Sequence, residues 1–91
     1  MARPRMRRKI CFNPKAYYFK PRGISMRDLR EVILTKEEME ALKLKDFDKL
    51  DQARSAEKMR TSQSTFQRIL SSARAKVAEA IVEGKALRIE K

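Results

Sequence analysis

Apolar side chains recur at spacings of three and four in the last third of the chain, which predicts one long helix. The positions are Phe66, Ile69, Leu70, Ala73, Val77, Ala80 and Ile81. Ser62 stands before this pattern and can accept a hydrogen bond from an amide of the first turn. Gly84 supplies the end signal. We therefore expect a helix of about 20 residues, roughly 30 Å long, with this stripe in the core.

A second start signal lies near the middle of the chain. Thr35 can cap a helix, and Glu38 follows three residues later, which is the capping-box spacing. The apolar positions of this first helix are Met39, Leu42, Leu44 and Phe47, up to a break at residues 46–50.

Between these two helices the pattern predicts a short one, of about nine residues from Asp51 to Met59. Either Asp51 or Leu50 marks its beginning, and an acid there suits the positive end of the helix dipole. A helix this short is not stable alone, so it must be held by packing at Ala56 and Met59.

Only a tight turn fits between Met59 and Ser62. Two helices joined in this way cross steeply, and the small Ala56 suits the point where their backbones approach. This arrangement is typical of a helix-turn-helix unit. Such turns usually contain a glycine, and here Arg60 stands in its place, so we expect a positive φ angle at Arg60.

The N-terminal part follows no helical pattern, because Pro4, Pro14 and Pro21 interrupt it. Residues 7–12 and 16–19 can form short strands. Residues 24–34 are ambiguous between a helical turn and a strand, and residues 85–91 form either a short strand or a loose tail.

The fold class that follows is mainly α, a three-helix domain with a helix-turn-helix. Its expected parts are an extended basic arm over 1–24, the helix-turn-helix domain over 25–84, and the tail or short strand over 85–91.

Charge adds a functional expectation to this fold. The formal net charge is +11, and residues 1–30 alone carry +9, with no acid before Asp28. A small domain with this imbalance is typically attracted to a polyanion, most commonly a nucleic acid.

Other classes of protein are disfavoured by what the chain contains. Its 91 residues make one small domain, without room for a deep enclosed active site. Cys11 is the single cysteine and the chain contains no histidine, so we expect no disulfide, metal, cofactor or catalytic triad. No apolar run approaches the roughly 20 residues of a membrane helix. We expect a cytoplasmic protein that is not an enzyme and does not bind a membrane.

The start of the long helix offers side chains suited to reading DNA. Glutamine pairs with adenine and arginine with guanine in the major groove. The expected base-reading residues are Gln63, Ser64, Gln67 and Arg68. The expected phosphate contacts are Arg3, Arg5, Arg7, Arg8, Lys9, Arg54, Arg60, Arg74 and Lys76. The alternative for the helix residues is an ordinary solvated face.

Two resemblances support this interpretation. Residues 34–82 resemble the promoter-reading fourth region of bacterial sigma factors, in the order capped helix, short helix, turn and long Arg-containing helix. The whole chain, including "RPRMRRKICFNPKAYYFKPRGI" and "VEGKALRI", is similar to a family of small archaeal and bacterial proteins described as predicted DNA-binding proteins of unknown function. The resemblance implies the fold and DNA binding, without a target sequence.

The hypothesis is therefore a sequence-specific binder of double-stranded DNA that regulates transcription, and we expect it to be a homodimer. Two alternatives stay open. One is an RNA-binding or ribosome-associated basic protein, and the other is a module that docks on RNA polymerase without contacting DNA.

Overall fold

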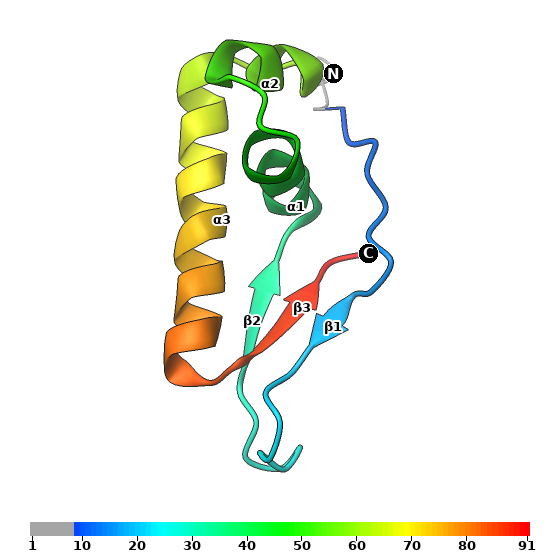
Figure 1. The fold of residues 1–91 in the computed structure, drawn as a ribbon, viewed down its shortest axis with the longest axis vertical. Coiled ribbons are helices and arrows are strands. Elements are labelled where there is room, and N and C mark those ends of the chain that lie inside the picture. The colour runs from blue at the N-terminus through cyan, green and yellow to red at the C-terminus, as the bar shows by residue number, and fades with distance from the viewer. Residues whose placement is uncertain (1–8) are drawn as a thin grey trace, which may run out of the picture.

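A computed structural model describes residues 9–91 of the chain, which form three helices and a short sheet (Figure 1). The helices are α1 (Lys36–Leu42), α2 (Gln52–Lys58) and α3 (Gln63–Glu83), and α1 continues into a π-helical turn, η1 (Lys43–Phe47). The strands are β1 (Tyr18–Phe19), β2 (Glu31–Leu34) and β3 (Ala86–Ile89). The mainly helical fold with three helices agrees with the sequence pattern, and the sheet adds a second layer.

The sheet joins the two ends of the described chain. Its order is β1-β3-β2, so the last strand along the chain is the central one. β3 runs parallel to β2 and antiparallel to β1. Residues 85–91 thus contain a strand rather than a loose tail, and the ambiguous segment becomes a strand at Glu31–Leu34. In the segment 7–12, residues 9–12 form no strand, and 7 and 8 lie outside the described residues.

One face of the sheet packs on the helices. Val32 and Leu34 are buried whereas Ile33 is half exposed, as expected for a strand whose side chains alternate between two faces. Leu34, Ala73 and Ile89 form a core cluster between the sheet and α3. Figure 1 shows the sheet beside the C-terminal half of α3, with α2 at the other end of the molecule.

The helix boundaries follow the expected local signals. Thr35 and Glu38 form a complete capping box at the start of α1. Asp51 caps α2 and Ser62 caps α3, each accepting a hydrogen bond from the amide three residues on. Gly84 ends α3 with a φ of 66°, in the left-handed region that glycine adopts without strain. The predictions for Thr35 with Glu38, for Ser62 and for Gly84 are confirmed, and of the two residues expected at the start of the short helix it is Asp51 that caps it.

Two residues expected in the core are instead exposed. Phe47 is 78% exposed, because the wider π turn breaks the 3.6-residue spacing on which its assignment rested. Ile81 is 75% exposed, since Ala80 takes the inward position in that part of α3 and the next residue points away. Over residues 9–91, no helix is long and apolar enough to cross a membrane.

Candidate nucleic-acid interface

The junction of α2 and α3 is a tight turn through Met59, Arg60, Thr61 and Ser62. Arg60 has a φ of 57°, which confirms the left-handed backbone expected at this position. Its N–H donates to the carbonyl of Glu57 at 3.0 Å, and the N–H of Thr61 donates to the carbonyl of Ala56 at 3.0 Å. These bonds satisfy two carbonyl groups at the end of α2, and the turn redirects the chain into α3.

Buried apolar side chains hold α2 and α3 together. One core cluster contains Ala56 of α2, Met59 at the C-terminal cap of α2, and Phe66 and Leu70 of α3, each at most 2% exposed. Ala56 is therefore buried at the α2–α3 contact, as the sequence pattern predicted. The same cluster includes Ala41 and Leu44, so α1 and η1 support the pair from behind.

The outer face of the first turns of α3 is polar and open to solvent. Gln63, Ser64, Gln67 and Arg68 are all exposed, and the first turn contains no acid. The Nε2 of Gln67 donates to the hydroxyl of Ser71 at 3.1 Å. The structure thus brings the four expected base-reading residues together on one accessible surface.

Three of the expected phosphate contacts line one groove, which reaches the turn at Arg60 but includes no residue of α3. Lys9, Arg54 and Arg60 line an open groove of about 800 Å³ between the N-terminal segment and α2. Lys58 lines it too and was missed from the sequence, because only the tertiary structure places it beside the other three. Acids on the same groove are Glu40, Asp48 and Glu57. Arg3, Arg5, Arg7 and Arg8 lie outside the described residues.

Arg74 is engaged within the protein. Its guanidinium makes two hydrogen bonds to the carboxylate of Asp46, at 3.0 and 2.5 Å. These bonds raise the pKa of Arg74 and lower the pKa of Asp46. The pair joins α3 to η1 at the surface, and a phosphate would have to compete with Asp46 for this cation.

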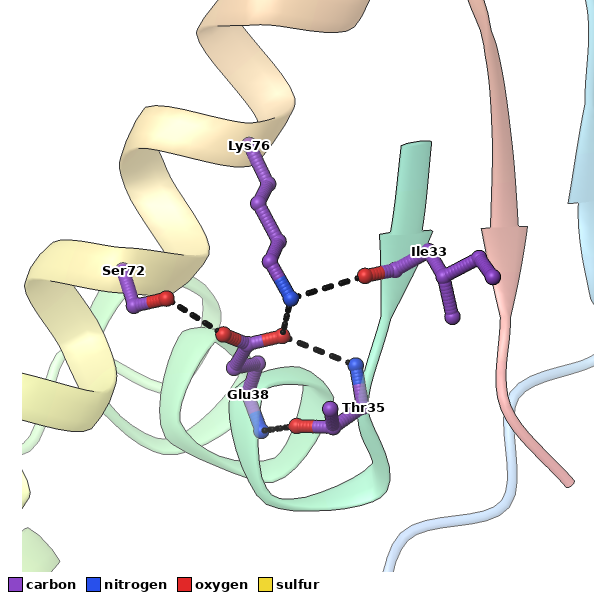
Figure 2. Close-up of polar contacts among 5 residues, drawn as sticks. All are labelled: Ile33, Thr35, Glu38, Ser72 and Lys76. Carbon is purple, nitrogen blue, oxygen red and sulfur yellow. Dashed lines mark hydrogen bonds and ion pairs between the residues drawn. The ribbon is translucent and has the colours of Figure 1, made fainter. Parts of the chain in front are cut away.

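Lys76 is engaged more deeply, in a network around Glu38 (Figure 2). Its Nζ donates to the Glu38 carboxylate at 2.8 Å and to the carbonyl of Ile33 at 2.8 Å. The Ser72 hydroxyl and the Thr35 N–H also donate to Glu38. Because these partners engage its ammonium group, a phosphate would have to displace them to bind Lys76.

Glu38 is buried, with 6% of the residue exposed, yet its carboxylate ionises readily. Burial raises its pKa, but the hydrogen bonds from Lys76, Ser72 and the Thr35 N–H together lower it further, so the pKa lies below its ordinary value of 4.5. Sequence reasoning found only the capping role of Glu38. Ser72 and Lys76 lie four residues apart and therefore on one face of the helix, and this spacing could have indicated that both contact the same partner.

Hydrogen bonds attach the N-terminal segment to α1 and to the α2–α3 turn. The Lys9 N–H donates to the carbonyl of Met59 at 3.1 Å. The N–H groups of Cys11 and Phe12 both donate to Oε1 of Glu40, at 3.1 and 2.9 Å. Figure 1 shows the described chain beginning beside α2. Sequence reasoning missed Glu40, because nothing near it in the chain indicates a partner 28 residues away.

These features define a small, mainly helical domain whose longest helix begins with an exposed, acid-free polar face, and whose N-terminal segment and α2 line a basic groove. The chain belongs to the family described as "Protein of unknown function DUF134", which matches residues 1–91. The family resemblance seen in the sequence is thereby confirmed.

Similar proteins in this family carry the name UPF0251 protein. That of Halothermothrix orenii is 52% identical over 90 residues, which cover 99% of this chain and 67% of the relative. That of Desulforudis audaxviator is also 52% identical, over 99% of this chain and 59% of the relative. That of Dehalococcoides mccartyi is 53% identical, over 99% and 77%. The chain thus spans 59–77% of the lengths of these relatives. No solved structure matches the chain significantly.

Proposed function

We propose that α2 and α3 form a helix-turn-helix unit, similar to the fourth region of sigma factors, that binds double-stranded DNA and regulates transcription. In this proposal the start of α3 enters the major groove and α2 lies across the phosphate backbone. The domain has no catalytic role.

The observation that carries the proposal is the turn at Arg60 together with the face it leaves open. A left-handed residue joins the two helices over a buried alanine, and Figure 1 shows α2 lying crosswise to α3. The same geometry leaves Gln63, Gln67 and Arg68 exposed while Phe66 is buried. A helix presented in this way fits the width of the major groove.

The side chains on this face suit base recognition. Glutamine can make two hydrogen bonds to adenine, arginine can make two to guanine, and serine can bond to either kind of base. Each good bidentate pair discriminates against the wrong base by about 1–3 kcal/mol. Gln67 already donates a hydrogen bond to Ser71, which supports its side chain in an orientation along the helix surface.

The cations of the groove would supply affinity without sequence preference. Lys9, Arg54, Lys58 and Arg60 surround one groove next to the turn, where they could follow a phosphate backbone. Each phosphate contact releases counterions, so affinity should fall steeply as salt rises. The net charge of +11 would add a long-range attraction to DNA.

The experiment that tests the proposal is selection of bound sequences from a random duplex pool, followed by titration of the selected DNA. A structured RNA and a random duplex of equal length, measured at the same salt concentration, are the controls. We expect an enriched motif and tighter binding to the selected duplex than to either control. Tighter binding to the RNA would favour the RNA-binding alternative. If the protein binds neither DNA nor RNA, docking on RNA polymerase is the alternative that remains.

The selected motif also tests the expected homodimer. A two-fold symmetric protein reads two half-sites about 34–36 Å apart, one helical turn of DNA. An inverted repeat with this spacing, together with a two-to-one protein–DNA ratio by sedimentation, would support the dimer. A single short motif bound one-to-one would contradict it.

A further inference from the structure

Gln52 forms a hydrogen bond between the two helices of the proposed helix-turn-helix unit. It is the first residue of α2 and is half-buried. Its Nε2 donates to the main-chain carbonyl of Gln63, the first residue of α3, at 3.2 Å. The turn at Arg60 joins the other end of α2 to the same part of α3. The first turn of α3 is therefore attached to α2 at both ends of that short helix.

The first turn of a helix needs such attachments, because its N–H groups have no partners within the helix. In α3 the Ser62 hydroxyl accepts a hydrogen bond from the N–H of Thr65 at 3.1 Å and donates to the Thr65 hydroxyl at 2.9 Å. Both bonds lie within the turn itself. The bond from Gln52 comes from another helix, so it fixes the position of the turn relative to α2.

The Gln63 side chain is more open to a partner than the other glutamine expected to read DNA. The amide of Gln67 already donates to Ser71. Among residues 9–91, no hydrogen bond engages the side chain of Gln63, which is exposed. Gln52 holds its main-chain carbonyl, whereas its amide keeps both a donor and an acceptor for a partner. A glutamine amide in this state can make two hydrogen bonds to adenine in the major groove.

We infer that Gln52 is a positioning residue, which holds the first turn of α3 so that Gln63 reads an A·T base pair. This inference rests on the proposed DNA binding and deepens it, because it names one base pair of the site. Gln52 acts through Gln63 and does not itself contact the base. Its effect is confined to that base pair, since Gln67 and Arg68 lie in the next turn of α3, beyond the attachment.

Altered specificity identifies the base pair that Gln63 reads. In the full chain, Gln63→Ala should abolish discrimination at one position of the selected duplex. Gln63→Arg should change the preference at that position from A·T to G·C, because arginine pairs with guanine. A bidentate contact discriminates by about 5- to 150-fold. Fluorescence anisotropy at fixed salt, with duplexes that differ only at this position, measures the ratio of the two affinities.

Gln52→Met then tests the positioning role. Methionine keeps the length and the helix propensity of glutamine but cannot donate a hydrogen bond. Because one hydrogen bond contributes a factor of about two to ten, the A·T preference at the Gln63 position should fall by about this factor. Discrimination at the position that Arg68→Ala identifies should stay unchanged. Ala53→Met is the matched control, an exposed neighbour on α2, and it should change neither preference.

Two further variants separate positioning from effects of charge and folding. Gln52→Lys restores a donor to the Gln63 carbonyl, so it should recover the preference that Gln52→Met loses. Ala53→Lys adds the same charge beside it and should tighten binding to all duplexes without changing their ratio. A ratio of affinities does not depend on the fraction of protein that is folded, so the test holds even where Gln52→Met is less stable.

The outcomes are distinguishable. In a chain that carries Gln63→Ala, Gln52→Met should have no further effect on discrimination. Equal losses from Gln52→Met at both positions would show that Gln52 supports α3 as a whole, and would overturn the positioning role. No loss at either position, or an unchanged preference in Gln63→Arg, would overturn it as well, while DNA binding stands. Absence of any selected motif would overturn the proposed function itself, and this inference with it.

Discussion

Lys76 lies 2.8 Å from the carboxylate of Glu38, and its ammonium also donates to the main-chain carbonyl of Ile33 (Figure 2). One side chain of α3 thereby joins the start of α1 to β2. Since β2 is an edge strand paired only with β3 in the described sheet, this bond also satisfies one of its outward carbonyls. The contact thus adds a polar link to the apolar packing of α3 on the sheet.

Replacing Lys76 by methionine should therefore destabilise the domain. The change keeps an unbranched side chain but leaves Glu38 and the Ile33 carbonyl without this donor. We expect a loss of about 1–3 kcal/mol in the free energy of unfolding, because Lys76 is partly exposed to solvent. Chemical denaturation measures it. Arg74→Met is the matched control on the same helix, and its exposed pair with Asp46 should contribute about 0–1 kcal/mol. Equal losses for both variants would contradict the network.

The same network predicts an acid-dependent stability. The pKa of Glu38 is lowered in the folded state, so its contribution is present above its ordinary value of 4.5 and is lost as pH falls through the folded pKa. Glu38→Gln keeps the capping box but cannot ionise. The difference in unfolding free energy between the natural chain and Glu38→Gln should be largest above about pH 5 and shrink in acid. A difference that stays constant from pH 7 to pH 3 would exclude this role.

Arg60→Gly should make the domain more stable and its DNA binding weaker. At a φ of 57° glycine avoids the strain of a side chain, and this gain should exceed its entropy cost by about 0.5–1 kcal/mol. The melting temperature should rise by a few degrees, at about 4–8 °C per kcal/mol. The lost cation should lower DNA affinity.

Lys49→Gly is the control, because Lys49 has a φ of 65° and lies outside the basic groove. It should raise stability and leave affinity nearly unchanged. Lower stability of Arg60→Gly would contradict the strain argument.

Substitutions of Gln67 and Arg68 should weaken binding to the selected DNA site more than binding to random DNA. Replacement of either by alanine should cost about 1–3 kcal/mol on the selected site and much less on a random duplex. Fluorescence anisotropy at fixed salt measures both. Arg88→Ala removes a cation from the exposed face of β3, where Arg88 pairs with Glu31, and serves as the control for net charge. Equal losses on both DNAs would make Gln67 and Arg68 phosphate contacts rather than readers of bases.

Ala56 should tolerate no larger side chain, because it is 2% exposed at the α2–α3 contact. Ala56→Leu should destabilise the domain by about 1–3 kcal/mol through overpacking. Ala53→Leu places the same side chain at an exposed position of the same helix and should have little effect. Thermal unfolding compares the two. If both variants melt like the natural chain, α2 does not approach α3 closely at Ala56.

The features that the sequence predicted well depend on neighbours along the chain. The caps at Thr35 and Ser62 and the end at Gly84 involve bonds within a few residues, so the local pattern specifies them. The positive φ at Arg60 follows from the short interval between two helical patterns. The exposed polar face of α3 follows in the same way from the positions of its buried residues.

The features that the sequence left open depend on segments far apart. The segment 85–91 becomes a central strand only because β1 and β2 flank it, although these lie more than fifty residues earlier. Local spacing also misled at Phe47, where a π turn rotates the side chain into solvent. The bonds of Lys76 to Glu38, and of Glu40 to Cys11 and Phe12, span 28 to 38 residues. Such pairings carry no local pattern, because burial and hydrogen-bond satisfaction select them only when the whole chain packs. The sequence by itself therefore determined the helices and the exposed polar face of α3, because these depend on local patterns. Tertiary packing decided which charges are paired within the domain, because those pairs join segments far apart in the chain.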